Sequence, residues 1–137
     1  MLIGNKEVGE RLGLKPKAKI ISVGNACTDA TLMLQGPTPA TKRALENIGM
    51  TKEDIDLWEM NEAFASPVLK FQQDMDIDPE TLNVNGGAIA MGHPLGATGC
   101  MILGTLMNEL IRRNKSTGLA TLCAGGGMGI STIIEIV

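Results

Sequence analysis

Aromatic side chains are nearly missing from this sequence, which has two Phe, one Trp and no Tyr among its 137 residues. Proteins that bind single-stranded nucleic acids stack the bases on aromatic rings, so we do not expect such a platform here. His93 is the only histidine, which excludes a multi-histidine metal site. The three cysteines, Cys27, Cys100 and Cys123, form no C-x-x-C pair and leave one over. We therefore expect neither a disulfide framework nor a thiolate metal site, but a reduced, cytoplasmic compartment.

The sequence also lacks a large excess of charge of one sign and a long apolar run. The 12 basic and 15 acidic residues give a net charge of −3, which argues against nucleic acid or an anionic membrane surface as the main partner. The longest apolar stretch, near residues 100–107, includes Gly104 and Thr105 and is far shorter than the ~18 residues of a membrane span. Because 44% of the residues are hydrophobic, we expect a folded domain with a buried core.

Hydrophobic periodicity predicts strands that alternate with helices. The expected strands cover residues 19–24, 55–60, 83–87, 118–123 and 130–137, and the expected helices cover residues 4–12, 38–48, 61–75 and 93–113. Strands separated by helices imply parallel pairing through crossovers, whereas the short turn at 124–129 makes the last pair antiparallel. We therefore predict an α/β fold with a mixed, mostly parallel sheet of about five strands, in the order β-α-β-α-β-α-β-β.

Local signals predict how several of these elements begin. Thr38 before Pro39 fits an N-cap followed by a proline in the first helical turn. Residues 51–54 fit a short capped turn. Pro67 interrupts the pattern that starts at Asn61, so this helix either begins late, with Ser66 as its cap, or is kinked.

The helix predicted at residues 93–113 is apolar on more than one side. Residues 100–103 are four consecutive apolar residues, and at 3.6 residues per turn they cannot all face one sheet. One explanation is a second covering layer, from a partner chain or from a domain outside these residues. The other is a broad stripe facing the core, with a few exposed methionines.

Three short segments combine reactive side chains with strand ends or helix starts. They contain Asn61, His93 and Cys123, and ligands of open α/β sheets bind at such edges. His93 lies between glycines and before Pro94. It projects from a loop as a reactive imidazole, or it is a helix-capping or hydrogen-bonded core histidine. Cys123 precedes three glycines whose N–H groups can form an oxyanion hole, or it is an inert buried thiol. Asn61 holds a water or a carbonyl, or caps a helix.

Other chemistries fit poorly. A phosphate-binding reading of residues 125–129 fails because no helix follows them. Asp56, Glu59 and Glu62 share no common face, so a carboxylate pair for hydrolysis is disfavoured. The sequence has no G-x-S-x-G motif, which disfavours a serine nucleophile.

Taken together, these segments resemble the C-terminal half of thiolases. The matching stretches are W-E-M-N-E-A-F-A at 58–65, N-V-N-G-G-A-I-A-M-G-H-P-L-G-A-T-G at 83–99, G-L-A-T-L-C-A-G-G-G-M-G at 118–129 and G-P-T-P-A-T-K-R-A-L at 36–45. The resemblance extends from about residue 14 to residue 137. It implies a thiolase C-terminal domain at residues 15–137, with residues 1–14 as the end of a preceding segment of a larger protein.

The resemblance implies roles for five residues. His93 matches the histidine that activates the acyl-accepting cysteine and contributes to one oxyanion hole, and Asn61 matches the asparagine that holds the water of that hole. Cys123 matches the acid/base cysteine at the α-carbon of the acyl-CoA. Gly125 matches the glycine whose N–H contributes to the other oxyanion hole, and Phe64 matches a residue near the acyl pocket.

The resemblance also implies what these residues need around them. Thiolases cleave 3-ketoacyl-CoA or condense acyl-CoA, with coenzyme A thioesters as substrates and no further cofactor. Their nucleophilic cysteine lies in the N-terminal half, and neither Cys27 nor Cys100 matches its motif. We therefore expect an N-terminal thiolase half as partner, a homo-oligomer, and no activity from these 137 residues alone.

Two other assignments stay open at this point. The first is a non-catalytic thiolase-like module for acyl binding or assembly. The second is a ketoacyl-synthase relative, although those proteins usually present two histidines.

Overall fold

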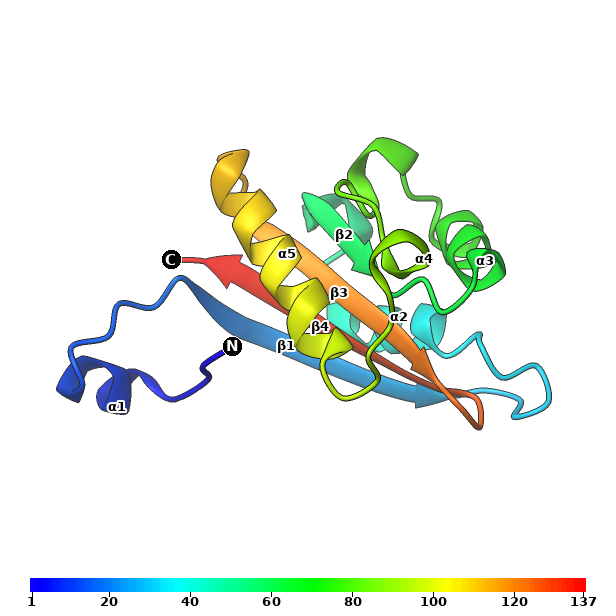
Figure 1. Ribbon diagram of the computed structural model, residues 1–137, viewed down its shortest axis with the longest axis horizontal. Helices are drawn as coiled ribbons and strands as arrows, with labels where there is room; N and C mark the ends of the chain where they lie inside the picture. The colour runs from blue at the N-terminus through cyan, green and yellow to red at the C-terminus, as the bar shows by residue number, and fades with distance from the viewer.

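The computed structural model describes residues 1–137 and shows one mixed sheet with helices on both faces (Figure 1). The four strands are β1 (Ala18–Cys27), β2 (Leu57–Met60), β3 (Thr117–Ala124) and β4 (Met128–Ile136), in the order β1-β4-β3-β2. β2 and β3 are parallel, whereas β4 is antiparallel to both of its neighbours. The α/β class is as predicted.

The sheet differs from the prediction in two details, its strand count and its share of parallel pairs. Only one pair is parallel, because a tight turn sends β4 back along β3 and β4 then lies between β3 and β1. The strand predicted at residues 83–87 is a loop. Leu82 alone bridges to Trp58, and Asn83 has a positive φ of 48°, which bends the chain away from the sheet.

Helices α2 (Pro37–Glu46) and α3 (Ala65–Met75) cover one face of the sheet, and α5 (Thr98–Arg112) covers the other. Alternation along the strands explains this arrangement, because neighbouring residues point to opposite faces. Trp58 packs with Phe71 of α3, whereas Leu57 packs with Leu106 and Leu110 of α5. The core therefore has two parts, one on each side of the sheet.

Three helices begin elsewhere than predicted. α2 follows Gly36 rather than a Thr38 cap, since prolines fit its first turn, where no N–H is needed. α3 starts at Ala65 after Phe64, so it begins late and Ser66 is not its cap. α5 starts only at Thr98, because residues 94–97 form a turn closed on the Pro94 carbonyl.

The remaining elements are short. Helix α1 (Lys6–Arg11) agrees with the prediction at residues 4–12, and η1 (Lys52–Asp54) carries the predicted cap, with Thr51 bonded to Asp54. η2 (Pro79–Thr81) and the four-residue α4 (Ala88–Met91) were not expected. None of the helices is both long and apolar enough to cross a membrane.

The two sides of α5 differ in burial. Leu106 and Leu110 are buried against the sheet, whereas Ile111 is 43% exposed. Within this chain the helix therefore has one covered face. The second layer predicted from its apolar sequence stays a prediction.

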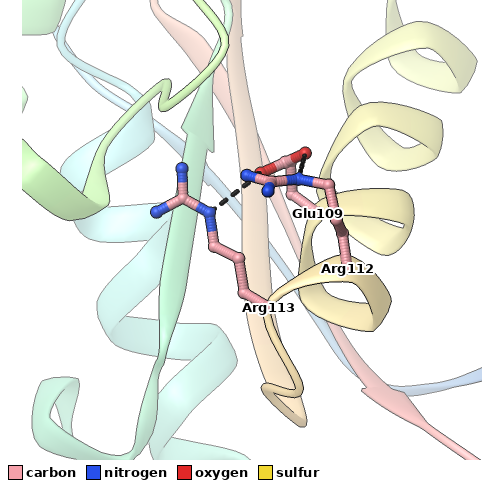
Figure 2. A network of polar contacts seen from close by, with 3 residues as sticks. All are labelled: Glu109, Arg112 and Arg113. Atoms are coloured by element: carbon pink, nitrogen blue, oxygen red, sulfur yellow. Dashed lines mark hydrogen bonds and ion pairs between the residues drawn. The ribbon is translucent and has the colours of Figure 1, made fainter.

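A carboxylate between two arginines marks the end of α5, as Figure 2 shows. Glu109 is 6% exposed; its carboxylate accepts two hydrogen bonds from Arg112 and one from Arg113, each 2.8 Å long. These bonds, with one from Asn85, lower the pKa of Glu109 to about 2. The carboxylate is therefore ionised and fully engaged at neutral pH.

A glycine contact joins α2 to β4. A Cβ atom at Gly129 would lie 2.1 Å from the Gly36 carbonyl carbon, and one at Gly36 would lie 2.4 Å from the Gly129 nitrogen. Backbone meets backbone here, so no side chain can move aside to make room. Gly129 also pairs with Cys123 across the β3–β4 ladder, so this contact lies next to a residue singled out by the sequence.

Replacing Gly129 with alanine is expected to lower the free energy of unfolding by about 3 kcal/mol, because α2 would have to move off the sheet. The measurement is the urea midpoint of unfolding. Gly9→Ala is the matched control, since a Cβ atom there meets open space. Equal midpoints for the two variants would contradict the close contact.

Candidate active site

The predicted site residues gather at the edge formed by the carboxyl ends of β2 and β3. Met60 at the end of β2 is in register with Thr121, and the Asn61 N–H continues the ladder with a 3.0 Å bond to the Thr121 carbonyl. Cys123 follows two residues later on the neighbouring strand. In Figure 1 the loop that leads into α5 lies at this same end of the sheet. Parallel strand ends are the usual ligand-binding edge of α/β sheets.

The ring of His93 is held in place by Thr98. His93 Nδ1 lies 2.7 Å from Thr98 Oγ1, and this hydroxyl donates its proton to the Pro94 carbonyl at 3.0 Å. Since the hydroxyl has no second proton, His93 Nδ1 must be the donor in its hydrogen bond with Thr98 Oγ1. The hydrogen-bond network thus assigns the neutral ring its proton on Nδ1, which leaves the Nε2 lone pair able to accept a proton.

Asn61 lies on the other side of the ring. Its Nδ2 is 3.3 Å from His93 Nε2, so two of the predicted site residues are in direct contact. Asn61 is 1% exposed, and its Oδ1 has no hydrogen-bond partner in the chain. A buried amide oxygen without a partner is rare, and it marks a place for a bound donor such as water.

The capping alternatives for these two residues are wrong. Phe64, not Asn61, is the N-cap of α3, and Ala97, not His93, is the N-cap of α5. Both polar side chains are therefore available for the site. The reason is the same in each case: a short irregular segment separates the residue from the helix that follows it.

Cys123 is buried near the end of β3, whereas Cys27 and Cys100 are exposed thiols. Burial removes water from the Cys123 thiol and raises its pKa. The thiol makes no hydrogen bond with His93 or Asn61 within the chain, so the structure places the three residues at one sheet edge but joins only two of them directly.

Gly125 begins the three-residue turn between β3 and β4. Gly126 and Gly127 have φ values of 83° and 84°, a conformation that favours glycine. Thr28 holds the turn from the end of β1, because its N–H and its hydroxyl both donate to the Gly127 carbonyl, at 2.8 and 3.1 Å. The Gly125 N–H donates to no atom of the chain, which leaves it available as an oxyanion donor.

Phe64, the fifth predicted site residue, has a different environment. It lies at the start of α3 and is 59% exposed. A large apolar side chain left open beside a polar site is suited to contact an apolar ligand or another part of a larger protein. The chain itself shows no contact that assigns it to the acyl pocket.

Sequence reasoning missed Asn83, which holds Asn61 in position. Its side-chain amide makes the two hydrogen bonds that a neighbouring strand would make with Met60. Oδ1 accepts from the Met60 N–H at 2.8 Å, and Nδ2 donates to the Met60 carbonyl at 2.9 Å. Asn83 thereby fixes the open edge of β2 immediately before Asn61. Its position in the N-V-N-G-G stretch was the available signal, but asparagine in such a stretch is usual in turns.

Glu62, which the sequence suggested only as a member of a disfavoured carboxylate pair, contacts the segment before His93. Its carboxylate accepts from the Ile89 N–H at 3.1 Å, in the first turn of α4, and lies against Gly87 so closely that a Cβ atom there would be 2.2 Å from Glu62 Cδ. Glu62, which directly follows Asn61, therefore connects the end of β2 to the segment that leads to His93. Its part is to position the site, not to act in a carboxylate pair.

Comparison with known proteins shows the family of this chain. A sequence model described as "Thiolase, C-terminal domain" matches residues 14–136. The chain belongs to the thiolase family. A crystal structure of the Bacillus anthracis acetyl-CoA acetyltransferase has the same fold, with a TM-score of 0.92 and 42% identity over 96% of this chain. The thiolase-like fold predicted from the motifs is thereby confirmed.

Similar curated proteins carry thiolase names. The chain is 49% identical to an acetyl-CoA acetyltransferase of Paracoccus denitrificans over 98% of its length, and 51% identical to a 3-ketoacyl-CoA thiolase of Alcanivorax borkumensis, also over 98%. It spans only 34% and 35% of those two proteins, and 34% of the Bacillus anthracis chain. This thiolase C-terminal domain thus corresponds to about a third of its relatives.

Proposed function

We propose that this chain supplies the acid/base and oxyanion-binding half of a thiolase that cleaves 3-ketoacyl-CoA or condenses acyl-CoA. The observation that carries the proposal is the His93–Asn61 contact, with His93 Nε2 unprotonated and Asn61 Oδ1 open to a donor. It lies at the same sheet edge as the buried Cys123 and the unengaged Gly125 N–H. A merely structural module has no need of this set.

His93 serves the first half of the reaction. Its Nε2 takes the proton of the nucleophilic cysteine, which belongs to the region outside this chain, and the thiolate attacks the ketone carbon of the substrate. The protonated Nε2 then becomes a hydrogen-bond donor beside Asn61. An oxygen that gains negative charge here is stabilised by this donor and by a water held on Asn61.

Cys123 and Gly125 serve the carbon–carbon bond. When the bond between the α-carbon and the ketone carbon breaks, its electron pair passes to the acetyl-CoA fragment, whose thioester oxygen becomes enolate-like. The Gly125 N–H donates to this oxygen, and the Cys123 thiol gives its proton to the α-carbon. In condensation the same thiol, as thiolate, removes that proton. The raised pKa of Cys123 keeps the proton on sulfur until it is needed.

The proposal includes the partners of the site. The region that corresponds to the other two thirds of the relatives provides the nucleophile and covers the outer side of α5. The substrates are coenzyme A thioesters, no further cofactor takes part, and the protein acts as a homo-oligomer. The three free cysteines support a reducing compartment, the cytoplasm.

The test compares two proteins in an acetoacetyl-CoA thiolysis assay. One is the 137-residue chain, and the other, called the full-length protein below, is this chain joined to the region that corresponds to the rest of its relatives. We expect thiolysis by the full-length protein and none by the chain alone, because neither Cys27 nor Cys100 matches the motif of the nucleophilic cysteine and Cys123 has the acid/base role. Thiolysis by the chain alone would overturn this division. A full-length protein that binds acyl-CoA without cleaving it would support a non-catalytic module instead.

A further inference from the structure

A small cavity lies beside Asn61 and contains a carboxyl group that the reaction does not use. The cavity measures about 50 Å³ and lies between the end of β2, α4 and the first turns of α5. Glu59 and Asn61 both line it, and they are 3% and 1% exposed. Glu59 Oε1 and Asn61 Oδ1 are the two buried side-chain polar atoms that have no hydrogen-bond partner. Two acceptors without donors thus line one cavity.

The cavity suits water better than a cation. A water needs about 10–15 Å³ of such space and two to four polar partners, which Glu59, Asn61 and the hydroxyl of Thr105 provide. The rest of the lining is mostly glycine and apolar side chains, among them Met101 and Ile102. A metal ion prefers more oxygen ligands than this lining presents.

The charges around Glu59 favour its uncharged form. Glu62 faces it from the end of β2 and Glu109 from α5, and both are acidic. The arginines nearby are bonded to Glu109, and the Glu59 side chain has no hydrogen bond or ion pair within the chain. Burial first, and then these two carboxylates, raise the pKa of Glu59 to about 8. At neutral pH the group is therefore a carboxylic acid, which has a proton to donate.

We propose that Glu59 is a positioning residue, which as an uncharged acid shares buried water with Asn61 Oδ1 and so keeps the Asn61 amide turned toward His93. This inference rests on the proposed function, because it gives the Asn61–His93 contact its purpose. The uncharged acid donates to the water, and the water donates to Asn61 Oδ1. Asn61 Nδ2 then faces His93 Nε2, as the structure shows.

The charge of Glu59 determines which end of the amide it attracts. An ionised carboxylate accepts hydrogen bonds only, so it would draw the Asn61 NH₂ group into the cavity. The amide oxygen would then face the His93 Nε2 lone pair, and the two would repel. Ionisation of Glu59 therefore turns the amide away from its working orientation.

Glu59→Gln and Glu59→Leu in the full-length protein test the inference. Glutamine keeps a donor and cannot ionise, so kcat at neutral pH should change less than about 3-fold, and the fall in kcat as Glu59 ionises should disappear. Leucine removes the donor, so kcat should fall roughly 10-fold with KM unchanged. Glu53→Gln is the control, because Glu53 is exposed. Equal kcat values for the Gln and Leu variants would overturn the inference.

Infrared spectroscopy tests Glu59 without reference to activity. The C=O stretch of a protonated carboxyl group should be present at pH 7, disappear with a midpoint near pH 8, and be missing from Glu59→Gln. An ionised Glu59 at pH 7 would refute the inference while leaving the proposed function intact. A full-length protein that shows the band but has no thiolase activity would refute the proposed function instead.

Discussion

Replacing Cys123 with serine in the full-length protein is expected to lower thiolysis and condensation by about 10³-fold, while acylation by acetyl-CoA continues. Serine keeps the size of the side chain, but its hydroxyl is far too weak an acid to exchange a proton with a carbon at neutral pH. Because the proposed function places the nucleophile outside this chain, the acyl-enzyme should still form. Steady-state rates and mass spectrometry of the acyl-enzyme measure the two steps separately.

Cys27→Ser provides the matched control for this experiment. It makes the same chemical change at an exposed thiol, and neither rate should move by more than about 2-fold. If Cys123→Ser slowed acylation as much as it slowed condensation, Cys123 would not be the acid/base. If it changed neither, the buried thiol would be an inert core residue.

Replacing His93 with alanine should slow acylation, the step that Cys123→Ser leaves intact, and the rate should fall by more than in Cys123→Ser. Acylation itself is expected to fall by roughly 10⁴-fold, because the change removes both the base that activates the nucleophile and a donor to the first oxyanion. The measurement is the rate of acyl-enzyme formation after rapid mixing with acetyl-CoA. The Cys123 and His93 variants should therefore fail at different steps.

Thr98→Val shows whether the orientation of the ring matters. It removes the acceptor of the Nδ1–H bond and leaves the imidazole in place, so acylation should fall by an intermediate factor of about 10 to 100. Normal acylation in Thr98→Val would mean that the tautomer is held by something else. Normal acylation in His93→Ala would remove His93 from the chemistry.

The long periodic segments were predictable because their patterns repeat over many residues. The strand around residues 118–123 was found with small errors at its ends, and the helix that ends near residue 113 was found although it starts at Thr98 and not at residue 93. The short segment at residues 83–87 was not. Asn83 has a left-handed backbone conformation where a strand was expected, because its side chain bonds to Met60 across the sheet edge. No local pattern reveals a bond between residues 23 positions apart.

The family was predictable from the motifs, but the geometry of the candidate site was not. The motifs around Asn61, His93 and Cys123 identified the family before any coordinates, and the family match agrees. The same sequence left helix capping open for two of them and weighed Glu62 only as part of a carboxylate pair. Whether a polar side chain caps a helix or faces a ligand depends on a turn of three or four residues, which local propensity does not decide.

By itself, the sequence determined the class of this protein: its alternating apolar pattern requires a sheet covered by helices, and its three motifs belong to thiolases. The tertiary structure decided the rest. The β4 insertion between β1 and β3, the tautomer of His93 and the burial of Glu59 all arise from contacts between distant segments. The physical reason is that hydrogen bonding and loss of water act through space, so the state of a side chain is set by neighbours that the order of residues does not reveal.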